Sequence, residues 1–243
     1  MNVLAICCTK GRHTHLEKAV KCFIDQDYKG LSTLLIYNNS NVSQYLYNIL
    51  LPQNKQILLI NRHTSLYDNT SYTSYGQAQN DALKLAPNSD AVTHMDDDDI
   101  YLPNHISEGV KGLIRGGKKA YKPKYSYYRG QNGIELQSNV MEPSIFVKRD
   151  YLDAHGYSNT NADSHLQWVN PLVNNNDIFI DEKGVPTFIY DWSGEIPVWK
   201  ISGDDANSEN FNNHNKTSQD HGDGIITPIP TENIQQYYNL IKK

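Results

Sequence analysis

Apolar runs and helical spacing alternate through the first hundred or so residues, and this alternation constrains the fold more than any other feature of the sequence. The runs at 3–8 (VLAICC) and 31–37 (LSTLLIY) are continuous and end in polar residues, which is typical of strands buried on both faces. Between them, residues 14–25 carry apolar side chains at helical spacing. Two further strands and one helix are predicted at 56–61, 91–95 and 76–86. This order predicts an α/β fold with a mostly parallel central sheet flanked by helices.

Polar side chains follow three of the predicted strands at the point where each strand ends. They occupy Thr9 to Arg12, Asn38 to Ser40 and Asp96 to Asp99. In open parallel sheets, ligands bind beyond the carboxyl ends of the strands. Three polar strand ends that converge on one crevice therefore favour a binding site over three unrelated loops.

Four consecutive aspartates, Asp96 to Asp99, follow the strand at 91–95. Two unit charges ~4 Å apart repel by about 4 kcal/mol at an effective dielectric constant of roughly 20, so the run opposes compact folding unless a positive charge lies among them. A solvated loop, or a helix start before Pro103, is the ordinary explanation. An EF-hand is excluded, because the positions that require Gly and Glu hold Tyr101 and Ser107. We interpret the run as a place that holds a cation.

Charge is segregated along the chain, although the net charge is only −5. Residues 111–130 carry seven Lys and Arg and no acid, which leaves fifteen Lys and Arg against twenty-seven Asp and Glu elsewhere. Tyr121, Tyr125, Tyr127 and Tyr128 are interleaved with these cations, and such alternation suits phosphates and stacked bases. A surface loop whose tyrosines pack inward is the alternative.

The second half of the chain has a weaker pattern. Residues 142–152 predict a strand and then a short helix, and 163–173 predict another helix. Residues 203–224 are polar and lack periodicity, which indicates a long loop that is either a tail or an active-site lid. A helix is expected after Thr231 or Asn233.

Membrane insertion and disulfide bonding are not expected. The longest apolar runs are far shorter than the ~18 residues that a membrane span requires, and the N-terminus has no signal-peptide pattern, so a cytoplasmic protein is predicted. Cys7, Cys8 and Cys22 do not make a disulfide framework and are predicted to be reduced core residues.

Three segments together resemble family 2 glycosyltransferases of the GT-A fold. VLAICCTKGRHTHLEKAVKCFIDQDYKGLSTLLIYNNS (3–40) has their strand, Thr-x-x-Arg turn, helix and second strand. SYGQAQNDALKLAPNSDAVTHMDDDDIYLPNHI (74–106) continues with Gly, Asn, helix, strand and Asp-x-Asp-Asp. HGYSNTNADSHLQW (155–168) is similar to the segment that carries the catalytic base. The resemblance implies a Rossmann-like fold, mostly parallel, with a C-terminal loop or lid and a final helix.

The resemblance also implies a domain organisation and a reaction. Residues 1–243 would form one GT-A domain, with a nucleotide-sugar-binding half at 1–115 and an acceptor-binding half at 116–243. The reaction would be a metal-dependent, inverting transfer of a hexose or pentose from a nucleotide sugar to an acceptor hydroxyl. A sugar-nucleotide nucleotidyltransferase is disfavoured, because the N-terminal Gly-rich loop of that class is absent.

In this family the aspartate run holds Mn²⁺ or Mg²⁺, which neutralises the charge that develops on the departing nucleoside diphosphate. By the family pattern, Asp98 binds the metal and Asp96 contacts the metal shell or the ribose. Side chains alternate in an extended segment, so Asp97 and Asp99 face the other way. Asp99 is expected to line the sugar pocket, and Asp97 to be exposed and without a role.

The family pattern places the donor's nucleotide and diphosphate near six further residues. These are Thr9, Arg12, Asn38, Asn39, Gln79 and Asn80. Acids normally occur where this chain has Asn38 and Asn39, so a UDP-sugar is favoured while uridine specificity stays open. Gln79 stands where an Arg is common, so one diphosphate contact is missing or moved.

The resemblance assigns the catalytic base to Asp163, which would deprotonate the acceptor hydroxyl; an ordinary helix N-cap is the alternative. Trp168 is expected to pack in the core, with stacking on an acceptor ring as the alternative. A C-terminal loop of GT-A enzymes often adds a His to the metal, and His221, or else His214, is the candidate here. His94 is expected to be buried.

The lead acceptor hypothesis is a hydroxymethylated pyrimidine base in DNA, because the basic segment lies on the side where GT-A enzymes bind acceptors. Its contacts would include Lys118, Lys119, Lys122 and Lys124. The Asn- and Tyr-rich composition suggests a bacteriophage protein, which would act in the host cytoplasm. A glycan or lipid-linked sugar is the rival acceptor. A non-catalytic nucleic-acid or metal-binding module is the alternative from another class.

Overall fold

The structure is a computed structural model that describes residues 1–9, 13–38, 56–62, 64–130, 133–139, 142–161 and 163–191. Several predictions fall outside these residues and stay predictions. They concern Arg12, Asn39, His214, His221, the loop at 203–224 and the C-terminal helix.

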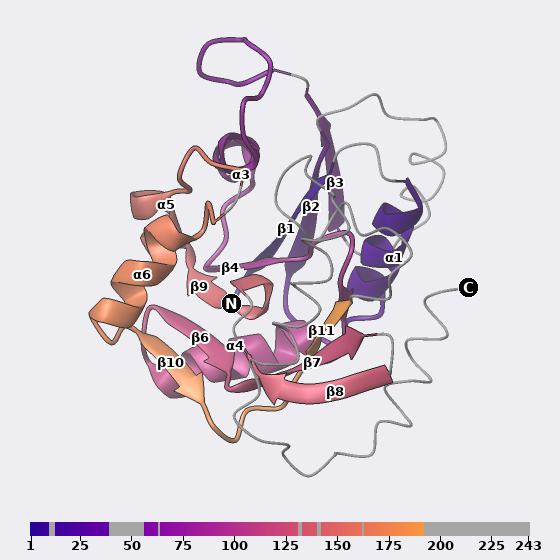
Figure 1. The fold of residues 1–243 in the computed structure, drawn as a ribbon, viewed down its shortest axis with the longest axis vertical. Coiled ribbons are helices and arrows are strands. Elements are labelled where there is room, and N and C mark those ends of the chain that lie inside the picture. Colours follow the sequence, from indigo (N-terminus) through magenta and orange to yellow (C-terminus); the bar gives the residue numbers. More distant parts are fainter. Residues whose placement is uncertain are drawn as a thin grey trace.

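A seven-stranded sheet in the order β10-β6-β9-β4-β1-β2-β3 forms the centre of the fold (Figure 1). Strands β3, β2, β1 and β4 are parallel, β9 is antiparallel to both of its neighbours, and β10 is parallel to β6. The predicted α/β class is thus confirmed. The strands are β1 (Val3–Thr9), β2 (Ser32–Asn38), β3 (Gln56–Asn61), β4 (Ala91–His94), β6 (Ala120–Pro123), β9 (Phe146–Lys148) and β10 (Ile178–Asp181).

Helices cover both faces of this sheet, as continuous apolar strands require. The odd residues of β1, such as Ala5, face the core cluster that contains α1 and α4, and the even ones, such as Ile6, face the cluster of α3, α5 and α6. Cys7, Cys8 and Cys22 are buried core residues, as predicted. The helices are α1 (His13–Ile24), α3 (Tyr75–Leu85), α4 (His105–Gly116), α5 (Arg149–His155) and α6 (Leu166–Asn174).

A second, four-stranded sheet in the order β5-β11-β7-β8 was not predicted. Its strands are β5 (Ile100–Tyr101), β7 (Tyr125–Gly130), β8 (Gly133–Ser138) and β11 (Phe188–Asp191). Strand β5 begins directly after the aspartate run, and the Asp191 N–H of β11 donates to Asp99 Oδ1, so this sheet lies next to the run. The second sheet therefore lies beside the carboxyl ends of the central strands.

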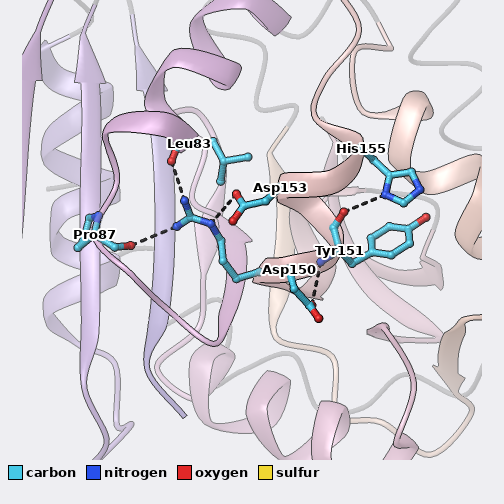
Figure 2. A network of polar contacts seen from close by, with 7 residues as sticks. Leu83, Pro87, Asp150, Tyr151, Asp153 and His155 are labelled. Atoms are coloured by element: carbon cyan, nitrogen blue, oxygen red, sulfur yellow. Dashed lines mark hydrogen bonds and ion pairs between the residues drawn. The ribbon is translucent and has the colours of Figure 1, made fainter.

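Arg149, the first residue of α5, ties α5 to the end of α3. Its guanidinium donates to the carbonyl oxygens of Leu83 (2.8 Å) and Pro87 (3.1 Å), and it pairs with Asp153 at 2.7 Å (Figure 2). The last carbonyls of a helix have no partner inside the helix, so a cation at this position is stabilising. This contact fixes the C-terminal end of α3.

None of the helices in the described part of the chain is long and apolar enough to cross a membrane.

Candidate functional site

The parallel register brings the polar strand ends into one row. Thr9 pairs with Asn38, and Asn38 pairs with Asn61 on the next strand. Asn38 is fully buried, and its side-chain amide donates to Asn61 Oδ1 at 3.0 Å. Thr9 and Asn38, both predicted to contact the donor, therefore lie side by side at the carboxyl edge of the sheet, as the sequence pattern indicates.

The aspartate run lies at the same edge, because Met95 continues from β4 and donates its N–H to Ile6 O at 2.9 Å. Its side chains alternate as predicted: Asp97 and Asp99 are buried, whereas Asp96 and Asp98 are half-buried. The expectation that Asp97 is exposed is wrong. Its carboxylate is 0% exposed and accepts a 2.6 Å hydrogen bond from the Thr9 hydroxyl.

Thr9→Val should lower the free energy of unfolding by about 1–3 kcal/mol, because a buried carboxylate oxygen loses this donor while the side-chain volume is retained. Urea unfolding measures the change. Thr9→Ser keeps the hydroxyl and serves as the matched control. Equal stability of the Val and Ser variants would show that the contact with Asp97 contributes nothing.

Lys18 of α1 and Asp191 of β11 contact the aspartate run, and neither residue is predicted from the sequence. The Lys18 ammonium lies 3.3 Å from Asp98 O and 3.5 Å from an Asp191 carboxylate oxygen. The Asp191 N–H donates to Asp99 Oδ1 at 3.1 Å. These contacts hold Asp98 and Asp99 through helix α1 and the second sheet. No sequence pattern marks Lys18, because it lies on a helix about eighty residues from the run.

Asp96 is in a strongly negative environment. Burial raises the pKa of Asp96 well above its usual range, and the carboxylates of Glu142, Asp98, Asp99 and Asp97 act in the same direction. Its Oδ1 accepts from the Tyr75 hydroxyl at 3.3 Å. A divalent cation would relieve this repulsion, so the surroundings of Asp96 fit the predicted cation.

Glu142 is a further site residue that sequence analysis missed. It begins the 3₁₀ turn η1 (Glu142–Ser144), and its carboxylate lies 3.3 Å from His165 Nδ1. Burial raises the pKa of Glu142 to about 7, and the charges of Asp99 and Asp163 contribute to the rise. The charges of Asp99, in the aspartate run, and of Asp163 therefore both act on Glu142. The sequence gives no signal for it, since the approach depends on a turn in the second half of the chain.

Asp163 is exposed and has a left-handed backbone, with φ of 57°. Asp tolerates this conformation better than most residues, although it remains uncommon. Helix α6 begins only at Leu166, and His165 is its N-cap residue, so Asp163 is not the N-cap. Its carbonyl accepts from the Leu166 N–H at 3.0 Å. The Asp163 side chain is thus accessible to solvent.

Gln79 and Asn80, both predicted to bind the donor, instead contact the segment that leads to Asp163. Gln79 is 1% exposed, and its Oε1 accepts from the Ser164 hydroxyl at 2.6 Å. The Asn80 side chain donates to Tyr157 O at 2.8 Å and accepts from Tyr157 N at 2.9 Å. These contacts occupy Gln79 Oε1 and both polar groups of the Asn80 amide, and donor binding by either residue stays a prediction.

Trp168 is a core residue, as expected, rather than an acceptor platform. It is 0% exposed and stacks on His94 with ring centroids 6.2 Å apart. His94 is also buried as expected, and its Nε2 lies 2.8 Å from the Tyr157 hydroxyl. Burial lowers the pKa of His94 to about 4, so this residue is neutral near pH 7.

The basic segment is regular structure, formed by the end of α4 together with β6 and β7. Tyr121, Tyr127 and Tyr128 are buried, which confirms the inward-packing alternative for these rings. Three of the four predicted lysine contacts have protein partners: Lys118 with Asn176 Oδ1 (2.8 Å), Lys122 with Asn139 O (2.6 Å) and Lys124 with Glu182 (3.1 Å). Lys119 is exposed. The segment therefore offers less free charge and fewer ring faces than its sequence suggests.

The donor set at the run fits Mn²⁺ or Mg²⁺ held by few protein ligands. Among the residues that the structure describes, no three His, Cys, Asp or Glu side chains are arranged as a metal cage. Mg²⁺ is commonly held by one or two carboxylates, with waters and substrate phosphates completing its shell. Asp96 and Asp98, the half-buried members of the run, match that arrangement in number and in chemistry.

Solved structures with the same overall fold are glycosyltransferases. Staphylococcus aureus TarS 1–349 matches with a TM-score of 0.62 and 15% identity, over 78% of this chain and 60% of that one. A mannosyltransferase from Pyrobaculum calidifontis, in complex with GDP-Man and Mn²⁺, has a TM-score of 0.58 and 12% identity, over 98% of this chain and 69% of that one. The chain has the GT-A fold.

A third GT-A structure is glucosyl-3-phosphoglycerate synthase from Mycobacterium tuberculosis, with Mn²⁺, UDP and its product. It has a TM-score of 0.52 and 13% identity, over 74% of this chain and 69% of that one. No protein-family model matches the sequence, and no curated protein is similar to it. The GT-A fold is therefore established from three-dimensional similarity.

Proposed function

We propose that the protein is a metal-dependent, inverting glycosyltransferase that moves a sugar from a nucleotide sugar to an acceptor hydroxyl. One observation carries the proposal: the aspartate run lies at the carboxyl ends of the central strands, and Tyr75 of α3 contacts both Asp96, through its hydroxyl, and Asn161, two residues before the exposed Asp163, through its N–H. A cation site next to a free base is what this reaction requires. The GT-A fold supports the same conclusion.

The proposed donor is a nucleotide sugar, with a UDP-sugar favoured. TarS has been solved with UDP-GlcNAc, and the mannosyltransferase with GDP-Man and Mn²⁺, which supports a nucleotide sugar and a divalent metal here. Thr9 and Asn38 lie at the strand ends where the nucleotide would bind. A contact of Asn38 with the base is kept as a proposal from the family resemblance alone, because the side chain is fully buried and its amide already donates to Asn61.

Each member of the site has a proposed role. Asp98 and Asp96 would hold Mn²⁺ or Mg²⁺, which neutralises charge on the leaving nucleoside diphosphate when it is bound. Asp99, buried beside them, shapes the sugar pocket. Asp163 takes the proton of the acceptor hydroxyl as that oxygen attacks the anomeric carbon from the face opposite the leaving group.

The domain halves are likewise proposed. Residues 1–115 would bind the nucleotide sugar, and the remainder of 1–243 would bind the acceptor. The chain spans 60% of the length of TarS 1–349, so none of that protein's own partners is transferred to this chain.

The proposed acceptor is a hydroxymethylated pyrimidine in DNA, and a glycan or lipid-linked sugar is the rival. Segregation of positive charge into residues 111–130 supports DNA. The burial of three of its tyrosine rings removes the stacking argument and strengthens the rival. A bacteriophage origin and a place in the host cytoplasm are part of the DNA proposal only.

The test is mass spectrometry of hydroxymethylcytosine-containing DNA and of a glycan panel after incubation with pooled nucleotide sugars and Mn²⁺. A hexose or pentose mass on the nucleoside would support the DNA acceptor, and addition to glycans alone would support the rival. Release of nucleoside diphosphate in either case excludes a non-catalytic binding module. Absence of release from every donor, with the metal present, would contradict the proposed enzyme.

If DNA is the acceptor, reversing the charge of Lys118 and Lys119 should weaken DNA binding and flatten its salt dependence. Each phosphate contact contributes about 0.9 to the slope of log K against log salt, so the double Glu variant should lose up to ~2 from it. Fluorescence anisotropy across a salt series measures this. Slow hydrolysis of the donor should be unaffected. An unchanged slope would exclude these two lysines as phosphate contacts.

A further inference from the structure

The start of α3 joins the segment that carries Asp163 to the aspartate run. The first N–H groups of a helix have no partner inside the helix. Here the Tyr75 N–H donates to Asn161 Oδ1 at 2.9 Å, and the Gly76 N–H donates to Thr160 O at 3.1 Å. Two such donors are therefore satisfied by the residues just before Asp163. The adjoining N-cap, Ser74, bonds Asn159 in the same segment.

Gly76 allows the two segments to touch. A Cβ atom at this position would lie 1.9 Å from Ser158 O and 2.9 Å from Ser164 Cβ, so any larger residue would force them apart. Glycine is the residue that permits such close backbone approach. The fit between α3 and residues 158–164 is thus set by backbone contact as well as by hydrogen bonds.

The segment is also closed on itself. The Ser158 N–H donates to Ser164 O at 2.9 Å, and the Ser158 hydroxyl lies 3.2 Å from the same oxygen. Ser158 and Ser164 are therefore held together, and Asp163 directly precedes Ser164. The left-handed backbone of Asp163 indicates a conformation that its surroundings must hold in place.

Gln79 is the side chain that anchors this far end. It lies one turn after Gly76 on α3 and is 1% exposed. Its Oε1 accepts a hydrogen bond from the Ser164 hydroxyl at 2.6 Å. On the same helix, the Tyr75 hydroxyl reaches Asp96 Oδ1. Residues 75–79, about one helical turn, thus contact both the aspartate run and the residue next to Asp163.

We propose that Gln79 is a positioning residue that sets the place of Asp163 relative to the aspartate run, through its hydrogen bond with Ser164. This inference rests on the proposed function, because it concerns the base of that reaction. An amide oxygen can accept the serine proton, and a guanidinium cannot.

The test compares Gln79→Met and Ser164→Ala with their double variant. Met keeps the volume and removes the acceptor, so both single variants should lower kcat for sugar transfer by about 10- to 100-fold through misplacement of the base. The losses should not multiply in the double variant, because the two residues act through one contact. Donor Kd, measured by calorimetry with Mn²⁺, should stay within about twofold of wild type. Amide hydrogen exchange over 158–164 should be faster in all three.

Arg149→Met is the matched control. It removes the bonds from Arg149 to the carbonyls of Leu83 and Pro87 at the other end of α3 and keeps the aliphatic stem. It should lower Tm and leave kcat for transfer unchanged, because none of the bonds that it removes is made by residues 158–164.

Three results would overturn the inference while wild type is active. One is a raised donor Kd in Gln79→Met alone, which would show that Gln79 contacts the donor. Another is a kcat equal to that of wild type in both single variants. The third is fully multiplicative losses with unchanged exchange at 158–164. A wild type that transfers no sugar to any acceptor would instead overturn the proposed function, and with it the base that Gln79 positions.

Discussion

Asp163→Asn should abolish sugar transfer while the donor still binds. The amide keeps the shape of the side chain and cannot take the acceptor proton, and a positioned general base contributes about 10²- to 10⁴-fold to a rate. Because Asp163 is exposed, the substitution leaves no buried group without a hydrogen-bond partner, and the fold should be retained. Transfer is measured as product formation at saturating donor, and donor affinity by calorimetry with Mn²⁺.

The left-handed backbone provides a second reason to choose Asn for this variant. Asn and Asp are the non-glycine residues that best tolerate a positive φ, so Asp163→Asn changes the chemistry without adding backbone strain. Asn69→Asp is the matched control, because Asn69 also has a positive φ and lies in the turn between Thr64 and Ser71. Wild-type turnover in Asp163→Asn would leave Asp163 with a role in the turn only.

The helices and strands of the first half are predictable because each carries its own signal. Strands β1 and β2 are continuous apolar runs, and both are buried along their whole length. Helix α1 places apolar residues at the spacing of one helical face. Local sequence therefore suffices wherever an element is long and is covered on both sides by the core.

The second sheet has no comparable signal. Strand β7 reads YSYYRG, and β5 has only two residues, so neither shows a continuous or an alternating apolar pattern. The partners also come from distant parts of the chain, since β11 pairs with both β5 and β7. Pairing between such strands is decided by tertiary contacts, and the basic segment was consequently interpreted as a surface rather than as part of a sheet.

Some residues of the candidate site are predictable from the sequence, whereas the contacts that they make are not. The aspartate run and Asp163 are visible in the sequence, as motifs and by family resemblance. The hydrogen bond from Thr9 to Asp97 is not visible, because it joins residues 88 positions apart and depends on the register of β1 against β4. The approach of Glu142, and the turn of Gln79 towards Ser164, depend on the second half of the fold in the same way.

Asp98→Asn should remove the metal-dependent part of donor binding. Loss of an outer-shell partner alone lowers metal affinity by roughly 10- to 100-fold, and loss of a ligand should cost at least as much. Asp98 is half-buried and has Lys18 at its carbonyl, so the backbone contact survives the substitution and the effect should be confined to the carboxylate. Donor Kd is measured by calorimetry with Mn²⁺ and with EDTA.

Thermal unfolding provides an independent measurement for the same variant. A cation that binds only the folded state raises its stability, and relief of the repulsion around Asp96 adds to this, so Mn²⁺ should raise the Tm of wild type. The Asp98→Asn variant should show little or no such rise, and its Tm without metal should equal or exceed that of wild type because one negative charge is gone. Asp90→Asn, at the opposite end of β4, is the charge-matched control and should respond to Mn²⁺ as wild type does. A full Mn²⁺ response in Asp98→Asn would show that Asp98 is not the metal ligand and would point to Asp96 or to another carboxylate of the run.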